Sequence, residues 1–333
     1  MTLAPYTPYD KMCSVEPRIV FMGTPEFALP TLERLATHYP LVGVVTQPDR
    51  PAGRGRRMVA SPVKEFALAE GIPLFQPERL RRMEAVERIR AWAPDLIAVA
   101  AYGQILRPSV LEIPRLGVLN VHASLLPRWR GAAPVQAALL AGDAVTGVTI
   151  MKLDEGMDTG PVLAKREVPI LPGETGGELE VRLAEVGAQL LLEVLPDYIA
   201  GLVQPQPQPQ EGVTLAPRIA TSAASIDWTC SAATLERHVR AFAPAPGAFT
   251  MLNGMRLKVL QGEAIDYDDA KADAALPGTV FSCDKFPAVV TGEGALVLLQ
   301  VQMAGKRPMN GDVFMRGRKD LLGAVLSSLR PGE

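Results

Sequence analysis

Short apolar runs alternate with amphipathic stretches over residues 18–200. The runs predict strands at 18–23, 41–47, 73–75, 95–102, 117–122, 147–153 and 162–170, and the intervening segments carry apolar residues at helical spacing. Such alternation is typical of a mostly parallel sheet with helices on both faces. We therefore predict a doubly wound α/β domain over 18–200, which ends in a long helix from about Glu174 to Ala200.

The pattern changes after residue 200. Residues 204–210 alternate Gln and Pro, a composition that cannot build a core and favours an extended polyproline II chain. Beyond it, one helical stretch at 231–242 precedes short runs rich in Val, Leu and Phe at 249–252, 256–260, 279–281, 288–291 and 296–302. These features predict a linker over 201–216 and a small β-barrel domain over 217–333.

The first 17 residues show neither pattern. They contain three prolines, mixed charge and no apolar stretch of the kind that a secretory signal needs. We predict that residues 1–17 form a flexible extension, within which Met12 is an alternative translation start.

Composition and motif content exclude several classes of protein. Apolar residues make up 48% and charged residues 21%, with 34 basic against 36 acidic side chains, which excludes a disordered or fibrous chain. No apolar run approaches the ~18 residues of a membrane span. The three cysteines and three histidines show no zinc-binding spacing, and the GxGxxG, Walker A, GxSxG and HExxH patterns do not occur. We expect a cytoplasmic protein without a metal.

The strand predicted at 117–122 carries candidate catalytic groups. Asn120 and His122 are two residues apart, so both side chains point to one face of that strand, at the carboxyl edge where open α/β sheets bind ligands. An amide and an imidazole there can stabilise a carbonyl oxygen as it becomes an oxyanion, and the imidazole can carry a proton. If the pair stood alone, a structural histidine at a strand end would be the better interpretation.

Two carboxylates, Asp154 and Asp158, follow the next strand on a turn-rich loop. A carboxylate beside His122 would fix the tautomer of the ring and complete a proton relay. We choose Asp158, because it precedes Thr-Gly-Pro, where the loop can turn inward, whereas Asp154 can cap the strand. An ordinary Asx-turn is the alternative for either residue.

A basic loop follows the second predicted strand. Residues 46–58 hold four arginines against the single acid Asp49, and two glycines allow the loop to move. The loop is longer than the roughly 2–6 residues usual for such a connection. It suits the phosphates of a nucleic acid, and a merely solvated loop is the alternative. The arginines are Arg50, Arg54, Arg56 and Arg57.

Three motifs together resemble a known enzyme family. They are Asn120-Val-His122, the run Ser-Leu-Leu-Pro-Arg-Trp-Arg-Gly-Ala-Ala-Pro over 124–134, and Asp-Glu-Gly-Met-Asp-Thr-Gly over 154–160, and they are similar to motifs of the folate-dependent formyltransferases. The Thr-Gln-Pro-Asp-Arg-Pro-Ala-Gly-Arg-Gly loop over 46–55 and the extra C-terminal domain narrow the resemblance to the members that formylate methionyl-tRNA. The resemblance covers about residues 18–320.

The resemblance implies a Rossmann-like catalytic domain that holds 10-formyltetrahydrofolate and an OB-like barrel that helps to bind the methionyl-initiator tRNA. The implied reaction moves the formyl group to the free α-amine of the esterified methionine, for translation initiation, through a tetrahedral intermediate stabilised by an Asn-His-Asp set. It implies no metal, no membrane and no obligate protein partner. The matching residues are Asn120, His122 and Asp158 for catalysis, Ser124, Leu125, Leu126 and Pro127 for the folate site, and Arg54, Arg56 and Arg57 for tRNA.

Three other functions fit part of the sequence. A formyltransferase for a small amine, such as an amino sugar nucleotide or a glycinamide ribotide, needs the same three catalytic residues but neither the basic loop nor the second domain. A folate-dependent hydrolase uses water in place of the amine. A nucleic-acid-binding protein without catalysis explains the loop and the barrel but leaves Asn120, His122 and Asp158 without a role.

Overall fold

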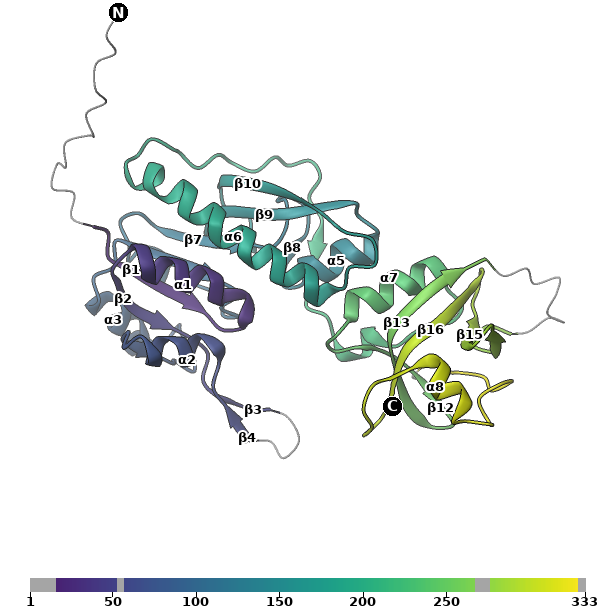
Figure 1. Ribbon diagram of the computed structural model, residues 1–333. Coiled ribbons are helices and arrows are strands. Elements are labelled where there is room, and N and C mark those ends of the chain that lie inside the picture. The colour runs from purple at the N-terminus through teal and green to yellow at the C-terminus, as the bar shows by residue number, and fades with distance from the viewer. Residues whose placement is uncertain (1–15, 53–56, 267–275, 329–333) are drawn as a thin grey trace, which may run out of the picture.

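The computed structural model describes residues 16–52, 57–266 and 276–328 (Figure 1). Within these ranges an α/β domain is followed by a mainly antiparallel β domain, and an extended segment joins the two. The extension predicted over 1–17 lies outside the described residues except for its last two. Among the helices of the described ranges, none combines the length and the apolar character needed to cross a membrane.

The α/β domain is built on a central sheet that has seven strands over the described residues. The five strands from β7 to β5 are parallel, whereas β9 runs antiparallel to both β7 and β10. The predicted mostly parallel sheet is therefore confirmed, and among its described strands β9 alone runs in the reverse direction, between β7 and the edge strand β10. In spatial order the strands are β10 (Val162–Pro169), β9 (Val145–Lys152), β7 (Val118–His122), β6 (Leu96–Ala100), β1 (Ile19–Gly23), β2 (Leu41–Val45) and β5 (Leu74–Phe75).

Strand β1 shows how helices cover both faces of this sheet. Ile19 and Phe21 point to a core formed with α1, α2 and α6, whereas Val20 and Met22 point to a second core formed with α3 and α4. All four side chains are fully buried, as expected for a strand covered on both faces. The helices are α1 (Leu29–His38), α2 (Pro62–Ala69), α3 (Met83–Ala91), α4 (Pro108–Leu111) and α6 (Gly176–Ile199).

The second domain is a curled antiparallel sheet. Val325 bridges Thr279, beside β14, and Ser327 bridges Met251 in β12, so the end of the chain closes the gap between the two outer strands. The predicted small β-barrel is thus confirmed, and α8 (Gly311–Arg316) packs against three of its strands. In spatial order the strands are β12 (Ala248–Leu252), β13 (Met255–Ile265), β16 (Ala295–Met303), β15 (Phe286–Val290) and β14 (Val280–Cys283), with β17 (Met309–Asn310) beside β16.

Helix α7 (Ala232–Phe242) joins the two domains. It packs against α5 (Pro134–Ala141) and α6, and the apolar core is continuous across this contact. A Cβ atom on Gly176, at the start of α6, would lie 2.6 Å from the carbonyl oxygen of Ala241, so this close approach requires glycine. The domains therefore touch through packed helices as well as through the linker.

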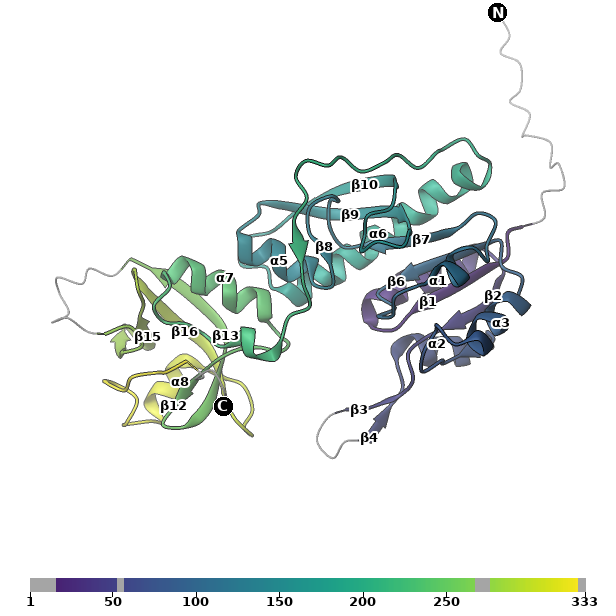
Figure 2. The same cartoon turned by 180° about the vertical axis from the view of Figure 1, so that it is seen from behind.

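The segment 201–216 lies along the α/β domain (Figure 2). Gln206 pairs with Val162 through backbone hydrogen bonds of 2.7 and 2.8 Å. Further along, β11 (Leu215–Ala216) pairs in parallel with β8 (Arg130–Gly131). The sequence pattern predicts the extended conformation of this segment, but it identifies no partner for it.

Candidate functional site

A cavity of about 700 Å³ lies at the carboxyl ends of β6 and β7. Its walls come from these two strands, from residues 101–106 and 153–158, and from the start of α5. Asn120 and His122 both line it from β7, where they are 9% and 6% exposed. The i, i+2 spacing therefore brings the two side chains to one site, as the sequence predicts.

The ring of His122 is held by a backbone group. Its Nε2 lies 3.0 Å from the carbonyl oxygen of Trp129, and because a carbonyl oxygen only accepts, Nε2 carries the hydrogen and donates it. The other ring nitrogen, Nδ1, lies 3.7 Å from Oδ2 of Asp158. That distance suits an ion pair with a protonated ring but is too long for a direct hydrogen bond. The contact that fixes the ring is thus the Trp129 carbonyl, which the sequence pattern does not reveal.

Asp158 is oriented by the loop that carries Trp129. Its Oδ2 accepts a hydrogen bond of 2.8 Å from the backbone N–H of Gly131, and its side chain is only 15% exposed. Its φ of 53° lies in the left-handed region, which is sparsely populated by residues other than glycine. Surrounding contacts must therefore hold this conformation.

Asp154 has a different environment. Its Oδ1 accepts hydrogen bonds from the backbone N–H of Gly156 at 3.0 Å and from the hydroxyl of Thr159 at 2.7 Å. These are the bonds of an Asx-turn within its own loop. The structure thus brings Asp158 to His122 and leaves Asp154 to shape the turn.

Asp143, just after α5, anchors the loop that contacts His122. It accepts two hydrogen bonds from Arg128, at 2.9 and 2.7 Å, and one from Nε1 of Trp129 at 2.8 Å. Burial by itself raises the pKa of the Asp143 carboxyl, but the bonds from Arg128 and Trp129 outweigh burial and hold that pKa below its usual value. This carboxylate stabilises Trp129 at a φ of 62°, again in the left-handed region.

Two residues that line the cavity carry polar side-chain groups without a hydrogen-bond partner within the described ranges. They are Asn120, through its amide, and Tyr102, whose hydroxyl is buried and has its pKa raised by that burial. Thr24 and Gln47 each donate to the Tyr102 carbonyl oxygen, at 3.1 and 3.2 Å, and so hold its loop. Polar groups of low exposure are nearly always paired, so the Asn120 amide indicates a place for a ligand. The position of Tyr102, just after β6, is the signal that sequence analysis overlooked.

The four residues predicted for the folate site lie beside the cavity and not among its lining. Ser124 and Leu126 are fully buried. The Ser124 hydroxyl donates to the carbonyl oxygen of Arg128 at 2.6 Å, and the ammonium group of Lys165 bonds to the carbonyl oxygen of Leu126. Leu125 and Pro127 are partly buried in the same turn. The segment 124–127 thus supports the loop that carries Trp129.

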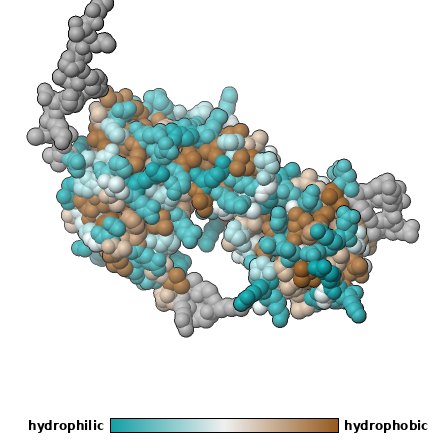
Figure 3. Space-filling view, in the orientation of Figure 1, coloured by the Kyte–Doolittle hydropathy of each residue, from teal (hydrophilic) through white to brown (hydrophobic). Residues whose placement is uncertain are grey.

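The basic loop is a hairpin in which β3 (Arg50–Ala52) pairs with β4 (Arg57–Val59). Arg54 and Arg56 lie outside the described residues. Strands β3 and β4 project from the α/β domain (Figure 1), and a hollow bordered by hydrophilic side chains lies between the two domains (Figure 3). At the base of these strands, Asp49 bonds to Nζ of Lys64 at 2.6 Å. Asp49, the single acid of residues 46–58, is thus paired with Lys64 at the base of the hairpin.

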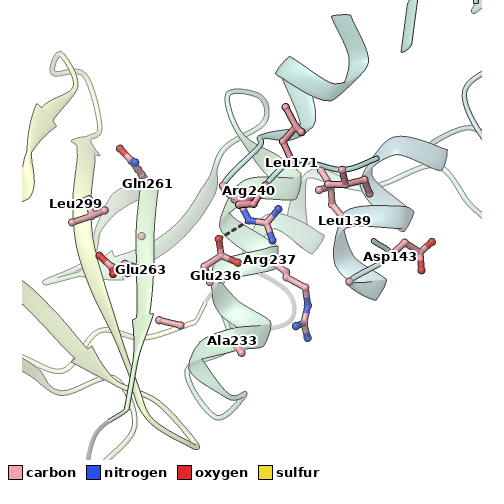
Figure 4. Close-up of a pocket in the computed structure, with 16 residues that line it drawn as sticks. Leu139, Asp143, Leu171, Ala233, Glu236, Arg237, Arg240, Gln261, Glu263 and Leu299 are labelled. Atoms are coloured by element: carbon pink, nitrogen blue, oxygen red, sulfur yellow. Dashed lines mark hydrogen bonds and ion pairs between the residues drawn. The ribbon is translucent and has the colours of Figure 1, made fainter. Parts of the chain in front are cut away.

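A second cavity, of about 730 Å³, lies where α5, α7 and β13 meet (Figure 4). Glu236 pairs with Arg240 there at 2.5 Å, and Asp143, at the edge of the lining, is engaged with Arg128. Nε of Arg237, another lining residue, is buried without a hydrogen-bond partner within the described ranges. Over the described residues, no cluster of three or more His, Cys, Asp and Glu side chains is placed to hold a metal.

Comparison with known protein families matches both domains. Residues 17–195 match the family described as formyl transferase, and residues 218–319 match the formyl transferase C-terminal domain. The chain is 49% identical over 304 residues to the methionyl-tRNA formyltransferase of Myxococcus xanthus and 50% identical over 308 residues to that of Halorhodospira halophila. Both alignments cover 91% of this chain and 96% of the relative.

Solved structures share the fold. HypX from Aquifex aeolicus, in complex with tetrahydrofolic acid, matches with a TM-score of 0.63 at 19% identity over 92% of this chain, which spans 48% of the length of HypX. The N-formyltransferase from Helicobacter canadensis, in complex with folinic acid and dTDP-3-aminofucose, matches with a TM-score of 0.62 at 16% identity over 86% of this chain and 99% of that one. At these identities the likeness shows the fold.

Proposed function

The chain belongs to the formyl transferase family, and within it to the methionyl-tRNA formyltransferases, and we propose from this membership and from the first cavity a role for each residue of the site. It transfers the formyl group of 10-formyltetrahydrofolate to the α-amine of methionyl-tRNA. The observation that carries this function is an identity of 49–50% over 91% of the chain, which includes both domains.

The first cavity suits the formyl donor. A pocket of about 700 Å³ whose walls combine apolar side chains with polar ones is of the size and character of small-molecule sites. The unpartnered Asn120 amide supplies hydrogen bonds to the donor, and residues 101–106 and 153–158 form walls of the pocket. Residues 124–127 do not line the cavity and instead support the loop that carries Trp129.

Asn120 and His122 stabilise the charge that develops during transfer. The neutral α-amine attacks the formyl carbon, a C–N bond forms, and the formyl oxygen becomes an oxyanion. The Asn120 amide donates a hydrogen bond to this oxygen, and the ring of His122, on the same face of β7, places its positive charge beside the oxygen once Nδ1 has taken up the proton of the amine. A donor preorganised in this way is worth on the order of 3 kcal/mol in the transition state.

His122 and Asp158 carry the proton. The amine loses a proton when the C–N bond forms, and N10 of the folate gains one when its bond to the formyl carbon breaks. Nε2 of His122 stays bound to the Trp129 carbonyl, so Nδ1 is the nitrogen that takes up and releases the proton. The Asp158 carboxylate, 3.7 Å away, attracts the charge of the protonated ring.

Both domains supply cations for the tRNA. We assign Arg54, Arg56 and Arg57 of the basic loop over 46–58 to the tRNA, and the described strands of that loop, β3 and β4, project from the α/β domain (Figure 1). The second domain adds exposed cations in the turn between β16 and β17, at the end of α8 and just after it, and such cations suit phosphate groups. We place the reaction in the cytoplasm, where initiator tRNA is used. The exposed cations are Lys306, Arg307, Arg316 and Lys319.

Formylation assays with the full chain test this function. The purified protein is given 10-formyltetrahydrofolate with charged methionyl-initiator tRNA, free methionine or a dTDP-amino sugar. We expect formyl transfer to the charged tRNA and little to the other two. Transfer to the amino sugar without transfer to tRNA would indicate a sugar N-formyltransferase, and release of formate without an acceptor would indicate a hydrolase.

A further inference from the structure

Gln208, in the middle of the Pro-Gln linker, bonds to the two loops that form the catalytic site. Its Nε2 donates to the carbonyl oxygens of Asp158 and Gly160, both at 2.8 Å. Its Oε1 accepts from Nε and Nη2 of Arg130, at 3.1 and 2.8 Å. Carbonyl oxygens only accept and a guanidinium only donates, so these partners determine which way the amide faces.

These bonds converge on the contact that orients the Asp158 carboxylate. Gly131, the neighbour of Arg130, donates its N–H to that carboxylate at 2.8 Å. Gln208 therefore holds both sides of this contact, one through Arg130 and the other through the Asp158 carbonyl. It also helps to keep Asp158 at a φ of 53°, a conformation that needs support from its surroundings.

The rest of the linker lies against the same loop. The Thr214 hydroxyl accepts from the backbone N–H of Trp129 at 2.9 Å, and its carbonyl oxygen accepts from the N–H of Arg130 at 2.9 Å. A Cβ on Gly131, whose φ is 125°, would lie 2.5 Å from the carbonyl oxygen of Ala216. The linker thus forms part of the support of the site.

We propose that Gln208 is a positioning residue for formyl transfer, which holds Asp158 against His122 from the linker. This inference rests on the proposed role of Asp158 in the reaction. Gln208 is not among the residues that line the cavity, so it acts through Asp158 and not on the substrates. Such supporting hydrogen bonds commonly set the precision of a catalytic group.

The chemistry of the amide suggests two informative substitutions. Gln208→Glu keeps the size of the side chain and its acceptors for Arg130, but it replaces both N–H donors by an oxygen that repels the two carbonyl oxygens. Gln208→Ala removes all four bonds. Gln210→Glu is the matched control, because Gln210 is an exposed linker glutamine whose side chain makes no hydrogen bond within the described ranges.

Steady-state formylation by the full chain, with thermal unfolding alongside, provides the test. We expect kcat to fall about 10-fold or more in both Gln208 variants and furthest in Gln208→Glu, because small displacements of a catalytic group are costly. The KM for charged tRNA and the Kd for the folate stay within about 2-fold, and Gln210→Glu behaves as wild type. Unchanged kcat in the Gln208 variants, or a raised KM at unchanged kcat, would overturn the proposal.

The double variant Asp158→Asn with Gln208→Ala tests whether Gln208 affects turnover through Asp158. If Gln208 acts through Asp158, the double variant turns over no more slowly than Asp158→Asn alone. Losses that multiply would overturn the proposal. Wild-type turnover by Asp158→Asn would instead overturn the proposed role of Asp158, and a wild-type chain that formylates no tRNA would overturn the proposed function, so the three failures are distinct.

Discussion

Nδ1 of His122 and Oδ2 of Asp158 lie 3.7 Å apart. They come together although β7, which ends at His122, and β9, which precedes the loop of Asp158, run in opposite directions. Strand β9 is antiparallel to β7, so its last residue, Lys152, pairs with Leu119 near the start of β7. The loop that follows must turn back along β7 before Asp158 reaches His122. The two aspartates of this loop therefore have different environments, with Asp158 at the imidazole and Asp154 in the turn.

We expect Asp158→Asn to lower kcat by about 100-fold, because the asparagine keeps the acceptor for Gly131 but loses the charge that faces His122. Asp154→Asn is the matched control and should stay within about 3-fold of wild type, since asparagine also forms Asx-turns. Single-turnover formylation with saturating tRNA measures the step directly. Equal losses in the two variants would show that the loop as a whole, and not the carboxylate at His122, matters.

His122→Ala and Asn120→Ala should each reduce turnover by at least about 100-fold while the affinity for tRNA changes little. Each change removes an interaction that is formed mainly in the transition state. Filter binding of charged tRNA and thermal unfolding check that binding and folding persist. Near-wild-type turnover in either variant is incompatible with the proposed oxyanion site.

The hydrophobic pattern predicts the elements of this fold closely. The strand predicted at 117–122 is β7 (Val118–His122), and the helix predicted at 231–242 is α7 (Ala232–Phe242). The pattern cannot give the direction of β9, because a buried strand has the same apolar run in either direction. It also cannot show that α7 packs against the first domain, since that contact depends on residues far apart in the chain.

The sequence likewise predicts some features of the candidate site and not others. The spacing of Asn120 and His122 suffices to place both at one strand end, because side chains alternate along a strand. The Trp129 carbonyl is a backbone group, and no residue type signals it. Gln208 lies in a repeat whose composition predicts a spacer, so only the folded chain shows its hydrogen bonds to the Asp158 loop.

Asp143→Asn should make stability less dependent on acid pH. The pKa of Asp143 is depressed in the folded chain, where bonds from Arg128 and Trp129 outweigh burial, so its ionised form stabilises the fold above the unfolded pKa of 3.8. This contribution disappears as the pH falls through the folded pKa. We expect the variant to lose about 1–2 kcal/mol at pH 7 and progressively less below about pH 4.

Urea unfolding at several pH values measures this difference. Glu33→Gln, at an exposed carboxylate on α1 without an ion pair in the described ranges, provides the control and should show no such trend. A difference between wild type and Asp143→Asn that stays constant from pH 7 to pH 3 would contradict the assigned role of the charge.

Arg54→Ala should weaken productive use of charged tRNA while the affinity for the folate stays near wild type. Residues 46–58 hold four arginines against a single acid, Asp49, which Lys64 engages at 2.6 Å. A loop with such an excess of cations gains most by meeting phosphates and releasing counterions. We expect kcat/KM for tRNA to fall at least about 10-fold, as measured at subsaturating tRNA.

Two further variants and the dependence on salt test the role of the Arg54 side chain. Arg54→Lys should restore only part of the loss, because lysine cannot fork onto phosphate oxygens or stack on unpaired bases as arginine does. Arg34→Ala, at an exposed arginine of α1 that pairs with Glu185, should leave tRNA kinetics unchanged. Added salt should reduce wild-type kcat/KM more steeply than that of Arg54→Ala, which has fewer phosphate contacts to lose. A raised folate Kd with unchanged tRNA kinetics would assign Arg54 to the folate site, and the hairpin would then no longer favour tRNA over a small amine as the acceptor.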